Sequence, residues 1–475
     1  MSSAVHQNGA NLRTATLPRL GSSQRTAPKP PVRIVHLGLG AFHRSHQAWY
    51  TQHAGDAAEW GIAAFTGRRP DAAVALAEQD GLYTVVERSD SGDTFELITS
   101  IVEAVDGADV GRLAELLAAP ATAVVTLTIT EAGYGLGRDG ELDTSAPAVA
   151  SDIAELGKPD VGTPSTPLGR LVLGLAARRS AGNGPIAVVC CDNLADNGAV
   201  ARRAVLGMAH AVDAGLADWI GANASFVSTS VDRITPRTTP SDVDAVSAAC
   251  GYLDESPVVT EPFRNWVLSG DFPAGRPQWE DAGAMFVAEI EPYENRKLWL
   301  LNGAHSLLAY AGRLRGHATV AEALADTKCR AAVEAFWDEA AEHLTTPGLD
   351  IPAYRAALLE RFGNSRIAHH LSQIAMDGST KLRLRALPVL QAERAAGRTG
   401  EGAARMIAAW MDYVSATVAA SEELADPLAD EAARTAALPV SERVPGLLRL
   451  LDPQLADDMG VTSLVVGLLG TFTDR

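Results

Sequence analysis

The first half of the chain alternates short apolar runs with longer amphipathic stretches. The apolar runs predict strands at Val32–Leu37, Gly61–Phe65, Leu82–Val86, Phe95–Val105, Ala123–Thr128, Ile186–Cys191, Phe226–Val231 and Met285–Ile290. Stretches rich in alanine and leucine predict helices between several of them, at Val110–Leu117, Leu168–Arg178 and Ala199–Ala214. Strands that alternate with helices in this way favour an α/β domain with a mainly parallel sheet.

The pattern changes after residue 290. Long helical patterns take over, at Val320–Ala325, Arg330–Leu344, Tyr354–Arg361, Glu401–Glu423 and Glu431–Ala437. We therefore expect an α/β domain over residues 31–290 and an all-α domain over residues 291–475. Residues 1–30 hold basic, Ser and Thr residues, no acid and no apolar stretch of a secretory signal. This composition, which a transit peptide shares, predicts a flexible N-terminus.

Composition limits the functions that the chain can serve. The formal net charge of −18 over 475 residues argues against a nucleic-acid partner, because phosphate binding needs clustered cations. No apolar run reaches the roughly 18 residues of a membrane-spanning helix, so we expect no membrane partner. The four cysteines lack the spacing of a metal site and fit a reducing, cytoplasmic setting.

The segment from Lys297 to His305 combines an amine, an amide and an imidazole with several leucines. At about 100° per residue, Lys297, Asn302 and His305 lie within an arc of roughly 140° on one side of a helix. Leucines share that arc, so the polar side chains should be buried or line a cleft. A lysine in such surroundings suits acid–base chemistry. On spacing alone, a snorkelling surface lysine and a satisfied core histidine are the commoner explanation.

A glycine pair follows the first predicted strand. Gly38 and Gly40 stand between that strand and a predicted helix, where glycines let the backbone approach a pyrophosphate and the helix start supplies N–H donors. His43 replaces the third glycine of the usual dinucleotide fingerprint, and the adjacent Arg44 suits a phosphate. A tight turn without a ligand is the alternative.

The end of the second predicted strand bears on the choice of cofactor. Asp71 would bind the ribose hydroxyls of NAD, whereas Arg68 and Arg69 would hold the 2′-phosphate of NADP. We favour NAD through Asp71, and NADP stays open. No metal is expected, because the pair His43 and His46 has no third ligand nearby.

Several motifs follow one another in sequence order. They are Gly38-Leu-Gly40-Ala-Phe42-His43-Arg44, Thr126-Leu-Thr-Ile-Thr-Glu131-Ala-Gly-Tyr134, Cys191-Asp192-Asn193-Leu-Ala-Asp-Asn197-Gly198, Val231-Asp232-Arg233 and the segment from Lys297 to His305. Together they resemble the mannitol dehydrogenase family of long-chain polyol and aldonate dehydrogenases. The resemblance implies a Rossmann-type domain, a helical domain, and metal-free hydride transfer between NAD(P) and a secondary alcohol of an open-chain sugar derivative.

The same resemblance implies roles for individual residues. Lys297 would be the general base, with Asn193 and Asn302 as partners of the developing alkoxide. The residues implied around the substrate are His305, Asp232, Glu294 and Lys381, and Arg385 is a further candidate because it lies near Lys381 in the sequence. The candidate cofactor contacts are Gly38, Gly40, Phe42, His43, Arg44, Asp71 and Glu131. The chemistry agrees, because a neutral lysine can take the alcohol proton and a hydrogen-bond donor to the alkoxide is worth roughly 3 kcal/mol.

The segment from Gln373 to Arg385 bears on the substrate. It resembles the fructuronate reductase (mannonate oxidoreductase) branch of the family, although Arg383 replaces that branch's usual proline. Lys381 with Arg383 or Arg385 could hold a C1 carboxylate, and a basic surface loop is the alternative. We expect D-fructuronate/D-mannonate or D-fructose/D-mannitol as substrates, with a slight preference for the acid.

Other readings of the whole chain stay open. The substrate could be another polyol, such as arabinitol or sorbitol. The chain could also be a nucleotide-binding sensor without efficient catalysis, although the set of Lys297, Asn302 and His305 argues against that class. The family tends toward monomers, so a monomer is expected and a dimer is the alternative.

Overall fold

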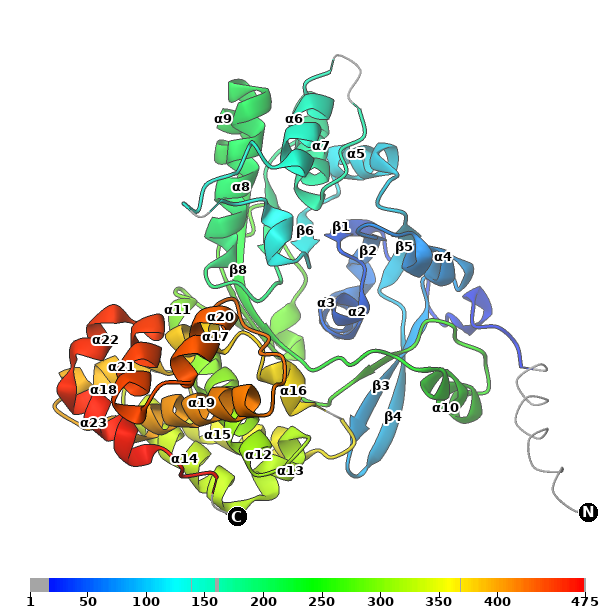
Figure 1. Cartoon of the computed structure of the whole chain (residues 1–475). Helices are drawn as coiled ribbons and strands as arrows, with labels where there is room; N and C mark the ends of the chain where they lie inside the picture. Colours follow the sequence, from blue (N-terminus) through cyan, green and yellow to red (C-terminus); the bar gives the residue numbers. More distant parts are fainter. Residues whose placement is uncertain (1–16, 138, 159–161, 368, 474–475) are drawn as a thin grey trace, which may run out of the picture. The chain divides into compact units, whose positions relative to one another are not determined.

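The computed structural model describes residues 17–137, 139–158, 162–367 and 369–473. The chain divides into two compact units between Glu291 and Pro292 (Figure 1). The first unit combines strands and helices, whereas the described part of the second unit is helical apart from an isolated bridge between Thr319 and His370.

The main sheet of the first unit has, within the described residues, eight strands in the order β11-β10-β8-β7-β6-β1-β2-β5. These strands are β1 (Val32–Leu37), β2 (Gly61–Phe65), β5 (Ile101–Val105), β6 (Val124–Leu127), β7 (Ile186–Cys190), β8 (Ala224–Asp232), β10 (Asn265–Ser269) and β11 (Met285–Phe286). All pairs from β5 to β8 are parallel, and β10 runs antiparallel to β8. The prediction of a mainly parallel sheet is therefore confirmed.

Helices cover this sheet on both faces, and a smaller sheet lies beside it. The helices are α2 (Ala41–Ser45), α3 (Gln47–Gln52), α4 (Asp71–Glu78), α5 (Val110–Ala118), α6 (Pro147–Leu156), α7 (Pro167–Ser180), α8 (Asn197–Val212), α9 (Ala214–Asn223) and α10 (Pro240–Cys250). The smaller sheet has the order β4-β3-β9, with β3 (Tyr83–Ser89), β4 (Gly92–Ile98) and β9 (Val258–Thr260).

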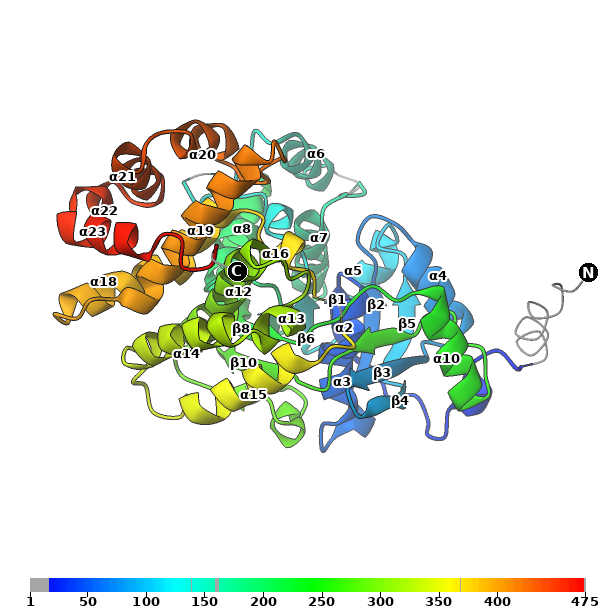
Figure 2. The same cartoon turned by 60° about the horizontal axis from the view of Figure 1, so that its bottom comes forward.

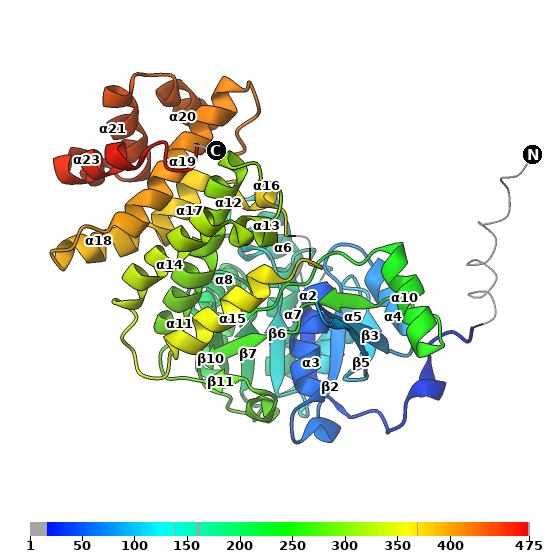
Figure 3. The ribbon, with the colours of Figure 1, turned by 90° about the horizontal axis from the view of Figure 1, so that it is seen from below.

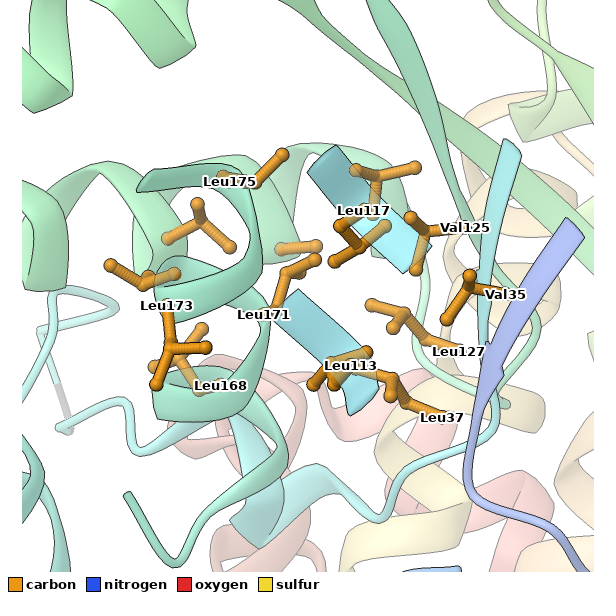
Figure 4. Close-up of a cluster of buried hydrophobic side chains, with 14 of the residues drawn as sticks. Val35, Leu37, Leu113, Leu117, Val125, Leu127, Leu168, Leu171, Leu173 and Leu175 are labelled. Carbon is orange, nitrogen blue, oxygen red and sulfur yellow. The ribbon is translucent and has the colours of Figure 1, made fainter. Parts of the chain in front are cut away.

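Alternation along β1 assigns its side chains to two separate cores. Val35 and Leu37 pack with leucines of α5 and α7 in one core, which Figure 4 shows. Ile34 belongs to the other core, with the aromatic side chains of α3. Because side chains alternate along a strand, His36 lies on the same face as Ile34. A polar side chain thus enters the apolar interior beside α2 and α3.

The second unit is built around three helices that pack on one another, α12, α14 and α19 (Figures 2 and 3). Its helices are α11 (Glu291–Arg296), η5 (Lys297–Gly303), α12 (Ala304–Leu314), α13 (Val320–Ala325), α14 (Thr327–Ala341), α15 (Ile351–Gly363), α16 (Leu371–Ile374), α17 (Gly378–Arg385), α18 (Leu387–Ala395), α19 (Glu401–Ala419), α20 (Ala429–Ala436), α21 (Val440–Leu451), α22 (Pro453–Asp457) and α23 (Met459–Leu468). Polar caps define several of their starts: the Asp326 carboxylate, for example, accepts the N–H groups of Lys328 and Cys329 where α14 begins.

Two predictions of local structure were wrong, and two strands were not predicted. The run 95–105 is not one strand, because the N–H of Thr99 donates to the Gln52 side chain and the Ser100 hydroxyl donates to the Ala48 carbonyl. The chain therefore leaves β4 in the small sheet and enters β5 in the main sheet. The predicted strand at 285–290 is only two residues long, and β9 and β10 were missed because each offers only a few apolar residues.

The N-terminal prediction also needs correction for residues 17–30. Leu20 is buried, and its N–H donates to the carbonyl of Leu253. Arg25 donates to the carbonyls of Thr99 and Asp80. This stretch is held by one buried apolar side chain, by hydrogen bonds to backbone carbonyls and by ion pairs such as that of Lys29 with Asp80. These contacts depend on residues distant in sequence, so the composition of the stretch does not reveal them. Residues 1–16 lie outside the described part of the chain. No helix of the described residues is long and apolar enough to cross a membrane.

Gly38 and Gly40 provide a matched test of local packing. Gly38 has φ +115°, and a Cβ there would lie 2.2 Å from the carbonyl oxygen of Thr128, whereas a Cβ at Gly40 would meet only the Gly38 oxygen, at 3.5 Å. We expect Gly38→Ala to lower the free energy of unfolding by at least about 2 kcal/mol. Gly40→Ala should change it by less than about 1 kcal/mol. Equal thermal unfolding curves for the two variants would contradict this packing.

Candidate active site

The glycine loop lies where the strand order of the main sheet reverses. β1 stands between β2 and β6, so the chain leaves the middle of the sheet in opposite directions. Gly38 follows the carboxyl end of β1, and Glu131 begins a short 3₁₀ turn after β6, with its side chain exposed. Open α/β sheets bind ligands at this switch point, outside the carboxyl ends of the strands. The loop thus has the position that a dinucleotide requires.

The side chains that follow the glycines mostly face inward. The His43 ring is fully buried and stacks on the ring of His36, with centroids 3.3 Å apart. The Arg44 guanidinium donates to the carbonyls of Gly40 and Ser256, at 3.3 and 2.5 Å. The His43 ring thus lies beneath the loop, and its role as a cofactor contact stays a prediction. Phe42 is half-buried and stacks on the ring of His46.

Asp71, the candidate ribose ligand, is the first residue of α4 after β2. Its carboxylate lies 3.5 Å from Nε of Arg69, and the two side chains are 75% and 86% exposed. Both side chains are thus accessible. The Asp71 carboxylate offsets the positive charge of Arg69, which would otherwise attract the 2′-phosphate of NADP. The pairing favours NAD over NADP at this strand end.

The loop after β7 is held by a polar network. The Tyr134 hydroxyl donates to the Asp192 carboxylate, and that carboxylate accepts the N–H of Leu194. The Asn197 amide donates to the carbonyls of Asp192 and Thr229. Asn193 stands inside this braced loop with its side chain exposed. Asp232 ends the neighbouring strand β8 and is buried.

In the second unit, α11, η5 and α12 form one continuous helix over residues 291–314, and its middle is a π-helix at Lys297–Gly303. In a π-helix the hydrogen bonds join residues i and i+5. Asn302 therefore stands one turn above Lys297, instead of roughly 140° around an α-helix. Both side chains are half-buried. The amine and the amide share one face more closely than the α-helical prediction implied.

Side chains from other helices stabilise this widened turn. The indole Nε1 of Trp337 donates to the Leu300 carbonyl at 2.8 Å, and Nη1 of Arg385 donates to the Asn302 carbonyl at 3.2 Å. Carbonyls in a π segment lack the regular i+4 donor, so external donors offset the lost α-helical geometry. A Cβ on Gly303 would lie 2.6 Å from the Phe336 ring, so this glycine lets α14 approach the turn.

His305 lies one turn further along, in a largely cationic environment. The residue is 8% exposed, and its ring centroid lies 4.7 Å from those of both Phe362 and His369. Burial, and then the charges of His369, Arg361, Arg385 and Lys381, hold the pKa of His305 well below its usual range. The imidazole is therefore neutral at neutral pH, and its Nε2 has no hydrogen-bond partner among the described residues.

The basic side chains of α17 make contacts with different helices. Arg383 donates to the carbonyls of Leu450 and Leu451, so it caps the end of α21. Arg385 instead reaches the Asn302 carbonyl and the Ser306 hydroxyl, and burial lowers its pKa to about 10. The Lys381 amine donates to the Ile374 carbonyl at 3.0 Å, and burial and then Arg385 lower its pKa. Of the two arginines considered for a carboxylate, only Arg385 contacts the π-helical segment.

Lys297, Asn302, His305 and Arg385 thus belong to one part of the second unit, with Glu294 one turn before Lys297 on the same helix. Several residues that support these side chains were not predicted. In the second unit they are Trp337 beside the π-helical turn and Arg361, Phe362 and His369 around His305. In the first unit they are Tyr134 and the buried His36. The ring of His369 packs against that of His305, which no local sequence pattern indicates. Among the described residues, no group of three or more His, Cys, Asp or Glu could hold a metal ion.

Comparisons with known proteins agree with this architecture. The model of the mannitol dehydrogenase Rossmann domain matches residues 32–281, and that of the mannitol dehydrogenase C-terminal domain matches residues 289–466. The chain therefore belongs to the mannitol dehydrogenase family.

Relatives with different substrates match at similar identity. The chain is 37% identical to D-mannonate oxidoreductase of Escherichia coli (strain K12), over 91% of this chain and 92% of the relative. It is 36% identical to mannitol 2-dehydrogenase of Cereibacter sphaeroides, over 81% of each. Among solved structures, Pseudomonas fluorescens mannitol 2-dehydrogenase in a ternary complex with NAD and D-mannitol is similar, with a TM-score of 0.75 and 32% identity over 95% of this chain and 99% of that one.

The low pKa of His305 predicts a pH dependence of stability. In the unfolded chain the imidazole takes up a proton below about pH 6.5, whereas the folded chain resists protonation. His305 therefore makes the folded state less stable as pH falls below that value, by up to about 1.4 kcal/mol per pH unit. We expect His305→Asn to reduce the slope of unfolding free energy against pH in this window, measured by urea unfolding. An unchanged slope would contradict a neutral, buried His305.

Proposed function

We propose that this protein is an NAD-dependent oxidoreductase that moves a hydride between nicotinamide and C2 of an open-chain sugar acid or polyol. The observation that carries the proposal is the π-helical turn, which aligns the Lys297 amine with the Asn302 amide in a chain of this family. An oxidoreductase of the mannitol dehydrogenase family uses NAD as its hydride acceptor or donor, and the cofactor supplies that redox chemistry when bound. The remaining chemistry belongs to the side chains.

The first unit has the features that suit NAD. Gly38 and Gly40 follow β1 at the switch point, and the space beside Gly40 is free of side chains. We assign the pyrophosphate to this loop and the ribose hydroxyls to Asp71. Phe42 and Glu131 remain candidate contacts, while Arg44 holds the loop through backbone carbonyls.

Lys297 is the proposed general base in alcohol oxidation and general acid in ketone reduction. Its neutral amine takes the hydroxyl proton as hydride leaves the same carbon, and its protonated form returns that proton in the reverse direction. The Asn302 amide, one π turn away, donates to the developing alkoxide. We propose the same role for Asn193 on the resemblance of its motif, and His305 orients the substrate as a neutral imidazole. Asp232 and Glu294 are proposed to contact the substrate hydroxyls.

The basic residues of α17 favour an acid over a neutral polyol. Burial lowers the pKa of both Lys381 and Arg385, so both cations would gain from a nearby anion. Among the described residues, the Arg385 guanidinium has no carboxylate partner. A C1 carboxylate would fill that role through charge-assisted hydrogen bonds. We therefore favour D-fructuronate/D-mannonate, with D-fructose/D-mannitol next and arabinitol or sorbitol after them.

The proposed setting is the cytoplasm, and the proposed state is a monomer. Cys190, Cys191, Cys250 and Cys329 are free thiols, and Cys190, Cys191 and Cys329 are buried, which suits a reducing compartment.

Removal of the Lys297 amine tests the proposed base. Lys297→Met keeps the length and apolar stem of the side chain, so the helix should persist. We expect turnover to fall about 10²- to 10⁴-fold, while the affinity for NADH, measured by fluorescence titration, is retained. Lys328→Met, an exposed lysine of α14, is the control and should be as active as wild type. Near-normal turnover of Lys297→Met would remove this residue from the mechanism.

A rate panel with NADH and NADPH on D-fructuronate and D-fructose tests the substrate. We expect faster turnover with the acid, and we expect Lys381→Met to raise KM for the acid about 10- to 100-fold while KM for the ketose changes little. Arg383→Met is the matched control on the same helix, because that side chain caps α21. Equal effects of Lys381→Met on both substrates would contradict a carboxylate contact. Activity on neither substrate would contradict the assignment itself.

A further inference from the structure

A buried chain of hydrogen bonds crosses the sheet beneath the glycine loop. The His36 ring on β1 lies between two threonines of the β6 segment: Nδ1 is 2.8 Å from Oγ1 of Thr126, and Nε2 is 3.0 Å from Oγ1 of Thr128. The Thr128 hydroxyl lies 2.8 Å from the Gly38 carbonyl oxygen and donates to it. This series of hydrogen bonds therefore ends on the first glycine of the loop.

Because the series ends on a carbonyl, the donor and the acceptor of each of its hydrogen bonds are determined. A carbonyl only accepts, so the single hydroxyl proton of Thr128 goes to Gly38. Oγ1 of Thr128 must then accept from His36 Nε2–H. Burial lowers the pKa of His36 to about 3, so the ring is neutral and its Nδ1 accepts from the Thr126 hydroxyl. His36 is therefore the Nε2–H tautomer.

A second chain approaches from the helix side and has its own fixed direction. His46 Nε2 lies 3.0 Å from the Asn265 carbonyl oxygen and must donate to it. His46 Nδ1 accepts from the Gln47 amide N–H at 2.9 Å, and the Gln47 amide oxygen lies 3.3 Å from His43 Nδ1. His43 is therefore the Nδ1–H tautomer. Its Nε2 is buried without a hydrogen-bond partner among the described residues.

The two chains meet where the rings of His36 and His43 stack, with an interplanar angle of 7°. His43 holds the position of the third glycine of a dinucleotide fingerprint, where a glycine normally lets the helix approach the strand. Here the flat ring of His43 on α2 stacks on the flat ring of His36 on β1, and this stacking lets the helix approach the strand closely. The stack requires both rings to be neutral, because a proton on either ring would bring a charge against a buried neighbour.

We propose that His36 is a positioning residue for the dinucleotide, acting through Thr128 on the Gly38 carbonyl and through His43 on the seat of α2. This inference rests on the proposed function, since it concerns how the loop is held for NAD. The N–H groups of Gly38 and Leu39 both donate to the Phe65 carbonyl of β2. The Gly38–Leu39 peptide is thus held from β2 at its N–H and from the β6 segment at its C=O. Its orientation sets the direction in which the following N–H groups point.

Thr126 and Thr128 offer a matched pair for the test, because each bonds one nitrogen of the same ring and only Thr128 reaches the loop. We expect Thr128→Val to weaken NADH binding about ten-fold, with turnover at saturating NADH within about two-fold of wild type. Thr126→Val should lose comparable thermal stability yet bind NADH within about two-fold of wild type. Thr128→Ser keeps the hydroxyl and should restore the affinity, which separates this role from a general loss of folding.

Nitrogen-15 NMR of histidine-labelled protein provides a readout that does not depend on activity. We expect the proton of His36 on Nε2 and that of His43 on Nδ1, with no titration of either ring near neutral pH. A proton on Nδ1 of His36, or equal effects of the two valine variants on NADH affinity, would overturn the inference. Wild-type protein that fails to bind NADH would instead overturn the proposed function, and the tautomers would still decide whether the chain of hydrogen bonds exists.

Discussion

The widened turn at Lys297–Gly303 is the constraint on which the chemistry of the second unit depends. An uninterrupted α-helix would separate Lys297 from Asn302 around the axis, whereas the i+5 bonding of a π segment places one above the other. Such a turn gives up regular helical hydrogen bonds, and it persists here because Trp337 and Arg385 donate to carbonyls within it. Arg385 thereby couples the geometry of the proposed catalytic pair, Lys297 and Asn302, to α17, the helix that carries the proposed substrate-binding cations.

In the first unit, buried polar side chains hold the backbone of the glycine loop in place. The loop needs close packing, and the interior beneath it contains the rings of His36 and His43, where apolar side chains would ordinarily stand. Each ring nitrogen of His36 has a hydrogen-bond partner, so these bonds replace the bonds to water that the ring loses on burial. The network also has direction, because it ends on a carbonyl. A buried network that is satisfied in only one arrangement specifies a single backbone conformation.

The sequence revealed the elements better than their contacts. The periodicity of apolar residues located β1, β2 and α13 to the residue, because a strand and a short capped helix depend on local spacing. It did not separate 95–105 into two strands, since Gln52, distant in sequence, breaks the ladder at Thr99. The π-helical turn was also hidden, because its braces come from Trp337 and Arg385. His36 interrupts an apolar strand with a polar side chain, but its role was not predicted, because it depends on the register of β1 against β6.

Helical spacing separates the two arginines of α17, Arg383 and Arg385, which composition alone does not distinguish as partners of Lys381. Arg385 stands four residues after Lys381, so the two cations share one face of the helix, whereas Arg383 lies two residues away and points elsewhere. The contacts follow this division: Arg383 caps α21, and Arg385 reaches the turn that contains Asn302. Two cations whose burial disfavours their charged forms stand on the face nearest the turn. An anion bound beside them relieves both penalties at once, which a hydroxyl cannot do. The proposed preference for an acid over a polyol therefore rests on the position of these charges more than on their number.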